Sequence, residues 1–60
     1  MKVKIARIKK KIKQQELAEM VGISREYLRK IENDVANPTK TIMIKIAEIL
    51  ECSVQELFFS

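Results

Sequence analysis

The fold of this chain is decided by residues 14–33, which read QQELAEMVGISREYLRKIEN. Apolar side chains recur there at the three- and four-residue spacing of helices: Leu17, Ala18, Val21, Leu28 and Ile31. Gly22 and Ser24 divide the stretch, because glycine adopts positive φ at a helix end and serine is a favoured N-cap. The stretch therefore predicts two short helices joined by a tight turn.

The second of these helices is expected to project from the surface. Ala18 is small enough for the second helix to cross close above the first, and Ile23 can fill the turn between them. Leu28 and Ile31 then fasten the second helix to the core, so the two helices meet at a fixed, steep angle. The outward side chains are Arg25, Glu26, Arg29 and Lys30. Side chains of these types form hydrogen bonds with the base edges and phosphates of DNA.

Helical patterns also flank this stretch. In the first segment Ile5, Ile8 and Ile12 recur at helical spacing with Val3 nearby, and we expect these isoleucines to face the core. No stretch alternates in the way that a strand requires. The chain breaks at Asn37-Pro38, because proline drives the preceding residue out of the helical region.

Two more helices are predicted beyond this break. Thr39 can cap a fourth helix, whose shared apolar face is Met43, Ile46, Ala47 and Leu50. Residues 53–56, Ser-Val-Gln-Glu, have the pattern of a capping box that opens a short fifth helix. The predicted fold is all-α, a compact bundle of five short helices in a single domain, residues 1–60.

Composition excludes several classes of function. The chain has 60 residues, 47% of them hydrophobic, so nearly every apolar side chain is needed for one small core. It has no histidine, the commonest metal ligand and general base, and it shows no nucleophile–base pair. We therefore expect no enzyme, metal, cofactor or small-molecule substrate. The single cysteine, Cys52, fits a cytoplasmic protein, and there is no signal-peptide pattern or membrane-length apolar run.

The positive charge is concentrated in the first half of the chain. Residues 1–32 hold ten Lys and Arg against four Glu, a net charge of +6. Residues 33–60 hold two Lys against four Asp and Glu, a net charge of −2. A basic face indicates a polyanionic partner, although charge alone is equally compatible with a solvated, lysine-rich surface.

The ordered spacing of these residues resembles a known family, the lambda-repressor-like regulators of phages and bacteria, also called the Cro/CI or XRE type. The matching residues are Gln14, Leu17, Ala18, Val21, Gly22, Ile23, Ser24, Leu28, Ile31, Glu32, Asn33, Asn37 and Pro38, followed by Ile46, Ala47, Leu50, Ser53, Glu56 and Leu57. The resemblance runs from about Val3 to Phe58. It implies a helix-turn-helix in the second and third helices and a sequence-specific transcriptional regulator of double-stranded DNA.

The resemblance also implies a role for individual residues. Those at positions that read base edges are Arg25, Glu26 and Lys30. Those at positions that contact phosphates or orient the protein are Gln14, Ser24, Arg29, Asn33 and Lys40. Gln14 is expected to brace the recognition helix as well, and Arg7 to pair with Glu32 as a structural link. Glu26 has two readings, since it can accept from a cytosine amino group or pair with Arg29 or Lys30 on its own helix.

The chain departs from the family at three helix ends. Lys11, Asp34 and Glu51 stand where family members often have glycine. Lysine and glutamate tolerate the left-handed conformation poorly. We therefore expect the first and fourth helices to end differently here and the loop after Asn33 to follow its own path.

The back half of the chain has more apolar residues than one helical stripe requires. They include Ile42, Ile44 and the four candidate dimer contacts Ile49, Val54, Phe58 and Phe59. The excess is compatible with a crowded core, but we favour an exposed patch that closes a homodimer, because one such domain covers few base pairs.

Three other functions fit parts of the sequence. An antitoxin would bind both DNA and a toxin protein. A protein-interaction module would keep this fold without DNA, against which the Arg and Lys of the third helix argue. A membrane-surface helix over Met1 to Lys13 lacks Trp or Phe as an anchor, and its isoleucines are expected in the core.

Overall fold

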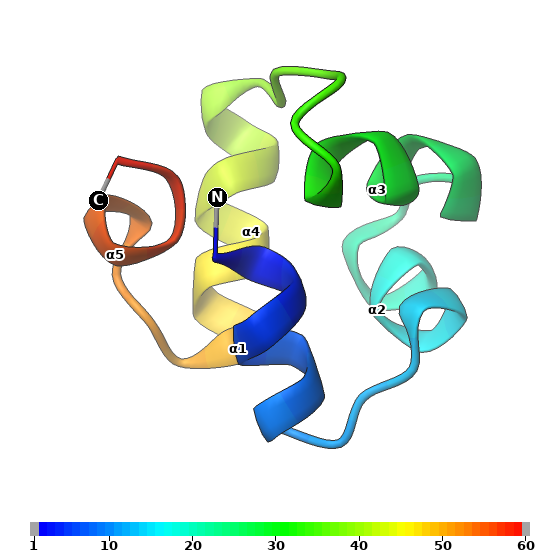
Figure 1. The fold of residues 1–60 in the computed structure, drawn as a ribbon, viewed down its shortest axis with the longest axis horizontal. Helices are drawn as coiled ribbons and strands as arrows, with labels where there is room; N and C mark the ends of the chain where they lie inside the picture. The colour runs from blue at the N-terminus through cyan, green and yellow to red at the C-terminus, as the bar shows by residue number, and fades with distance from the viewer. Residues whose placement is uncertain (1, 60) are drawn as a thin grey trace.

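All regular secondary structure in the computed structural model, which describes residues 2–59, is helical. The helices are α1 (Val3–Lys9), α2 (Gln14–Val21), α3 (Arg25–Glu32), α4 (Lys40–Leu50) and α5 (Val54–Phe58). Helix α4 packs against α1, α2 and α5, and α3 packs on α2. In Figure 1, α5 therefore lies on one side of α4 and the α2–α3 pair on the other. The predicted all-α bundle of five short helices is confirmed.

The side-chain caps that the sequence predicts begin three of the helices. The hydroxyls of Ser24 and Thr39 each accept a hydrogen bond from the backbone N–H three residues on, at 3.0 and 3.2 Å. At the start of α5, the Ser53 hydroxyl accepts from the Glu56 N–H at 3.0 Å, and the Glu56 carboxylate accepts from the Ser53 N–H at 3.1 Å. These bonds satisfy N–H groups that a helix N-terminus leaves without partners.

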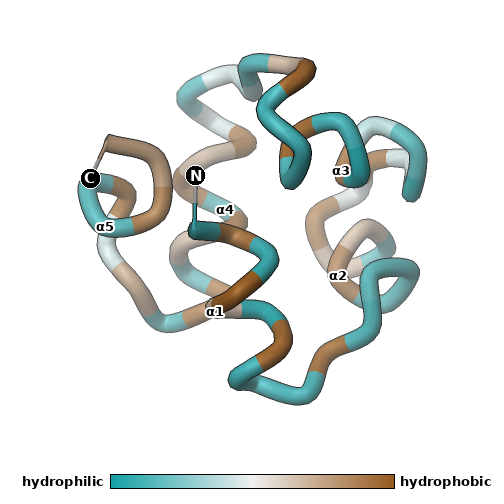
Figure 2. The backbone as a smooth tube through the Cα atoms, viewed as in Figure 1, coloured by the Kyte–Doolittle hydropathy of each residue, from teal (hydrophilic) through white to brown (hydrophobic). Residues whose placement is uncertain are grey.

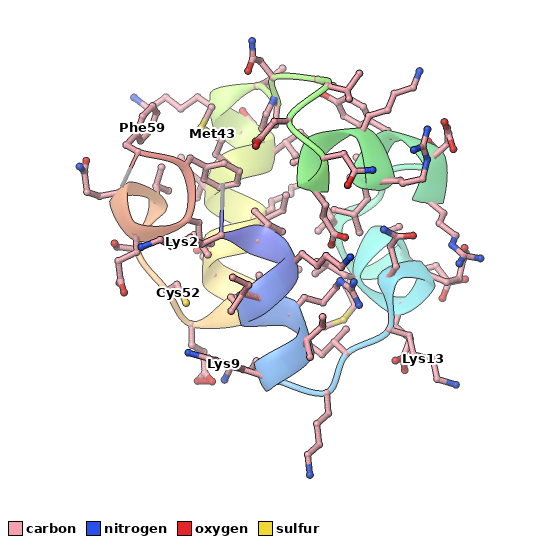
Figure 3. All side chains as sticks on the ribbon, in the orientation of Figure 1. Lys2, Lys9, Lys13, Met43, Cys52 and Phe59 are labelled. Carbon is pink, nitrogen blue, oxygen red and sulfur yellow. The ribbon has the colours of Figure 1, made fainter. Side chains whose placement is uncertain are left out.

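One side of each helix meets in a single core. Its residues, each at most 4% exposed, are Val3, Leu17, Ala18, Val21, Leu28, Ile31, Ile46, Ala47, Leu50 and Leu57. Figure 2 shows hydrophobic and hydrophilic residues alternating along the helices, as this one-sided burial requires. Figure 3 shows the opposite result at the surface, where long charged side chains point outward around the molecule.

The expected inward face of α1 is wrong. Ile5 and Ile8 are 59% and 55% exposed, whereas Val3 and Arg7 are buried. Arg7 lies one turn after Val3 and takes the inward position because its charge has a partner in the core, and this turns the two isoleucines outward. Ile12 does pack on the core, but from beyond the end of α1.

The expectation that α1 and α4 end differently from the family pattern is also wrong. Helices α1 to α4 are each followed by a left-handed residue with φ of 56° to 87°: Lys11, Gly22, Asp34 and Glu51. The next N–H then donates to the carbonyl five residues earlier, the bond of a Schellman motif, at 2.8 to 3.2 Å.

A tertiary contact explains why non-glycine residues adopt this conformation. The residues that follow Lys11 and Glu51 are Ile12 and Cys52, and both pack against the core. Burying an apolar side chain offsets the steric cost of the left-handed residue before it. After Asp34 the next residue is Val35, which is 70% exposed, so no such burial stabilises that turn. Aspartate tolerates the conformation better than lysine or glutamate does.

Candidate nucleic-acid interface

Helix α3 has a buried side and an exposed side. Leu28, Ile31 and Glu32 are buried against the rest of the molecule, and Tyr27 is half-buried against the core. The exposed side, which we call the recognition face, consists of Arg25, Glu26, Arg29 and Lys30. Gly22, with φ of 87°, and the Ser24 cap set the turn that leads into it. The structure thus places all four sequence-predicted side chains on one solvent-facing surface.

A buried ion pair lies beneath α3 and joins it to α1. Arg7 Nε donates to Glu32 Oε2 at 2.7 Å, and Arg7 Nη2 donates to Glu32 Oε1 at 3.3 Å. Arg7 Nη1 also donates to the Ile12 carbonyl at 2.8 Å, so the guanidinium orders the turn after α1 as well. Within residues 2–59, every buried side-chain nitrogen and oxygen has a hydrogen-bond partner. The pair that the resemblance implied is confirmed.

Gln14 extends this buried pair to the surface. Its Nε2 donates to Glu32 Oε1 at 2.9 Å, and its Oε1 accepts from Arg25 Nε at 3.3 Å. A continuous chain of hydrogen bonds therefore runs from Arg7 through Glu32 and Gln14 to Arg25. The sequence pattern predicted that Gln14 braces the recognition helix, but it did not predict the contact with Arg25. The sequence feature that could have predicted this contact is that Gln14 and Arg25 each begin a helix, and that a tight turn joins the two helices.

Glu26 is engaged within its own helix. Its two carboxylate oxygens accept from Arg29 Nε at 3.0 Å and from Arg29 Nη2 at 2.6 Å. The hydrogen bond to Arg29 is the main reason why the pKa of Glu26 lies below its ordinary value, and it raises the pKa of Arg29 in turn. Of the two interactions predicted for Glu26, the one present in the protein without DNA is therefore the pair with Arg29 on its own helix. Lys30 adds a weaker electrostatic influence on the pKa of Glu26.

The N-terminus of α2 differs from those of α3 and α4. No side chain caps it, and the Glu16 carboxylate accepts only the N–H of Lys13, at 2.8 Å. The first N–H groups of α2 consequently remain available to an external acceptor, and a helix N-terminus favours an anion. Gln14 lies at this end, beside Arg25 of the recognition face.

The remaining predicted DNA contacts lie at helix ends. Ser24 is exposed and uses its hydroxyl to cap α3. Asn33 is exposed directly after α3, and Lys40 is exposed as the first residue of α4. The segment between them is ordered by Schellman bonds and by the buried Pro38.

The candidate dimer contacts divide into two kinds. Ile49, Val54 and Phe58 are half-buried and pack against the molecule's own core. Phe59 is 61% exposed, and Ile44 on α4 is 42% exposed. In Figure 3, Phe59 lies at the same edge of the molecule as Met43 of α4. The excess of apolar residues in the back half thus serves partly as core, while Ile44 and Phe59 remain exposed.

A family model described as helix-turn-helix matches residues 3–57. Because the match spans nearly the whole chain, the chain belongs to this family, which is the XRE or Cro/CI type of helix-turn-helix. The protein is a DNA-binding transcription regulator of that type. A search of curated proteins finds no significant match. Among residues 2–59, no helix has the length and apolar character to cross a membrane.

Proposed function

We propose that this regulator binds a short palindromic operator as a homodimer, with α3 of each protomer in the major groove. The observation that carries the proposal is the recognition face: four charged side chains exposed on a helix whose other side is fixed by the core. A single domain of this size covers few base pairs, whereas a dimer reads two half-sites one helical turn apart.

Arg25, Glu26 and Lys30 read base edges in this proposal. Within residues 2–59 the one side-chain hydrogen bond of Arg25 uses Nε, which leaves both Nη groups for guanine O6 and N7. Lys30 lies five residues on, about 140° around the helix, and reaches a different base step. Glu26 either releases Arg29 to accept from a cytosine amino group or keeps it and sets its direction.

The positioning contacts surround this face. They are Gln14, Ser24, Arg29, Asn33 and Lys40, which meet phosphates and carry no sequence information directly. The uncapped N–H groups of α2 support a phosphate contact beside Gln14. The hydrogen bond from Arg25 to Gln14 gives Gln14 a second task, because it holds a base-reading side chain in place.

A pair of substitutions tests these roles. Arg25→Ala should lower specific affinity by about 1–3 kcal/mol and relax the preference at one base position of each half-site. Gln14→Ala should weaken binding to all sequences by a similar factor, with any relaxed preference confined to that same position. Binding-site selection from random DNA at fixed salt measures both effects, and Lys9→Ala on α1 is the matched control. If both variants lose affinity uniformly, Arg25 is a phosphate ligand and the proposed readout is wrong.

The dimer is proposed to form through Ile49, Val54, Phe58 and Phe59. Phe59 is the best test, because it is exposed and its replacement removes little from the core. Phe59→Asp should shift the protein toward monomer in sedimentation velocity while leaving its melting temperature nearly unchanged. A variant that sediments like the original would move the interface to another surface. Deletion of residues 58–60 should have the same effect on association, with a loss of stability because Phe58 packs on the core.

A further inference from the structure

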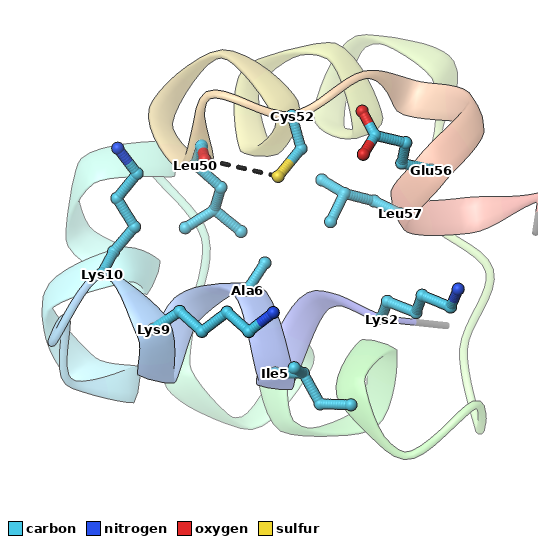
Figure 4. A pocket seen from close by; sticks show the side chains of 9 residues that line it. All are labelled: Lys2, Ile5, Ala6, Lys9, Lys10, Leu50, Cys52, Glu56 and Leu57. Carbon is cyan, nitrogen blue, oxygen red and sulfur yellow. Dashed lines mark hydrogen bonds between the residues drawn. The ribbon is translucent and has the colours of Figure 1, made fainter.

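A hollow of about 420 Å³ opens between α1, the C-terminal end of α4 and α5, and we call it the α1–α5 hollow (Figure 4). Its floor consists of Ala6, Leu50 and Leu57, and Cys52 and Ile5 form facing walls. Ala6 packs on the core with a side chain of only one methyl group, so it fills little of the space between α1 and α5. The volume falls within the range of sites that bind small molecules in proteins.

The exposed isoleucine of α1 belongs to this hollow. Ile5 lines it and is more than half exposed, although α1 has only seven residues with which to cover the core. Leu50 and Leu57 are buried, so the floor continues directly from the core. A hydrocarbon chain laid in the hollow would cover Ile5 and remove apolar surface from water on both sides.

The rim of the hollow is basic. Lys2, Lys9 and Lys10 line it against a single acidic residue, Glu56. Lys10 forms an ion pair with Glu51 outside the hollow. Hydrogen bonds with Ser53 are the main reason why the pKa of Glu56 lies below its ordinary value, and the charge of Lys2 lowers it slightly further.

Lys9 is a rim cation that is available to a ligand. Within residues 2–59, no carboxylate forms an ion pair with it. Figure 4 shows its side chain lying along α1 at the mouth of the hollow, on the same side as Ile5. An apolar floor with the ammonium group of Lys9 at its edge suits a molecule with a hydrocarbon tail and a negatively charged head.

We propose that the α1–α5 hollow binds a medium-chain alkyl carboxylate, with the tail on the apolar floor and the carboxylate at Lys9. The site is separate from the recognition face, because none of its lining residues belongs to α2 or α3, and α5 lies on the opposite side of α4 from the α2–α3 pair (Figure 1). The ligand therefore does not compete with DNA for the same side chains. The proposal does not depend on the DNA-reading roles given above.

Cys52 provides a direct assay, because it is the chain's one cysteine and its side chain lies in the wall of the hollow. The rate of its alkylation by iodoacetamide is measured in the full chain with increasing decanoate. We expect alkylation to slow by about tenfold at ten times the dissociation constant, since a covered thiol reacts only when the ligand is absent. The melting temperature should rise together with this protection.

Three comparisons identify the chemistry of binding. From hexanoate to decanoate, affinity should rise by about fourfold per methylene until the hollow is full. Decanol, which has the same tail without the charge, should protect Cys52 more weakly. Lys9→Gln should weaken decanoate by about two- to fivefold, the scale of an exposed ion pair, and leave decanol unchanged.

Matched variants separate this site from general attraction to the surface. Lys45→Gln removes an exposed lysine of α4 that does not line the hollow, and it should leave decanoate affinity unchanged. Ile5→Ala should weaken decanoate, whereas Ile44→Ala, at another exposed isoleucine, should not.

The proposal is overturned by any of four results. The first is that decanoate does not protect Cys52 from alkylation even at about 10 mM, the highest concentration of the titration and well above typical dissociation constants. The second is that decanol protects Cys52 as well as decanoate does. The third is that Lys45→Gln weakens decanoate binding as much as Lys9→Gln does. The fourth is that alkylation accelerates while the melting temperature falls, which would mean that the amphiphile unfolds the chain.

Discussion

The contact between α1 and α3 and the exposed face of α1 differ in the kind of side chain that is buried. Charged side chains are buried at the contact, whereas apolar side chains are exposed on the other face. Beneath α3, the charged side chains of Arg7 and Glu32 are buried, and they form hydrogen bonds with each other, with the Ile12 carbonyl and with Gln14. At α1, the apolar Ile5 and Ile8 remain largely in water. The side that we propose to face DNA is thus the one where Gln14 and Arg25 are linked by hydrogen bonds to a buried ion pair.

This difference indicates what the buried pair contributes. Replacing a buried ion pair by apolar residues of similar size is often neutral or stabilising, so stability alone does not explain it. The pair instead orients Gln14, which in turn holds Arg25. We infer that the pair positions Gln14 and Arg25 at the recognition face.

The largest expected effect is the salt dependence of DNA binding. If a dimer neutralises about six to ten phosphates, affinity should fall roughly 10³–10⁵-fold between about 50 and 200 mM salt. Fluorescence anisotropy with a labelled operator measures this slope. Lys30→Gln on α3 should reduce the slope, and Lys9→Gln on α1 should change it less. A flat response would remove the electrostatic distinction between the two sides.

Loss of the buried pair should be the largest change in stability. Arg7→Ala leaves the Glu32 carboxylate without its main partner, at a cost of about 3–5 kcal/mol in the free energy of unfolding. Urea denaturation measures this, and Lys9→Ala, at an exposed position of the same helix, should stay within about 0.5 kcal/mol. An unchanged stability of Arg7→Ala would show that the pair contributes nothing.

The double variant Arg7→Met with Glu32→Leu sharpens the comparison. It should recover much of the stability, because no unpaired charge remains buried. It should still bind the operator more weakly than the original protein, because Gln14 has lost its anchor. Recovery of both stability and operator affinity would contradict a positioning role for the pair.

A smaller effect is expected at the left-handed helix ends. Lys11 has φ of 59°, so Lys11→Gly should relieve a steric cost of about 1–2 kcal/mol and lose about 0.4–1 kcal/mol through the more flexible unfolded chain. The net change is a stabilisation of about 0.5–1 kcal/mol. Lys13→Gly, at φ of −73°, should instead destabilise, because there is no strain to relieve. Equal changes in the two variants would show that Lys11 is unstrained.

The smallest effect concerns the titration of Glu26. Its pKa should lie below the ordinary 4.5 because Arg29 donates to the carboxylate, and Arg29→Gln should raise it. Since the folded pKa is lowered, the contribution of this contact is present above the ordinary pKa and is lost as pH falls through the folded pKa. Side-chain carbonyl NMR follows the titration. A midpoint at or above 4.5 would mean that the pair does not form in solution.

Short-range chemistry was sufficient to predict much of this protein. Helix ends and caps depend on interactions within a few residues, so the sequence was enough to predict the roles of Gly22, Ser24, Thr39 and Ser53. The spacing that places Arg25 and its neighbours on an outward face is equally local, because it follows from the period of one helix.

Tertiary structure decided what depends on distant partners. Periodicity favours Ile5 and Ile8 over Arg7 as inward residues of α1, yet Arg7 is buried because Glu32, 25 residues away, neutralises it. Lys11 becomes left-handed because the next residue, Ile12, gains a place in the core. Both outcomes are decided by contacts formed only when the helices assemble, and there the energy of burial and pairing exceeds the local preference of the chain.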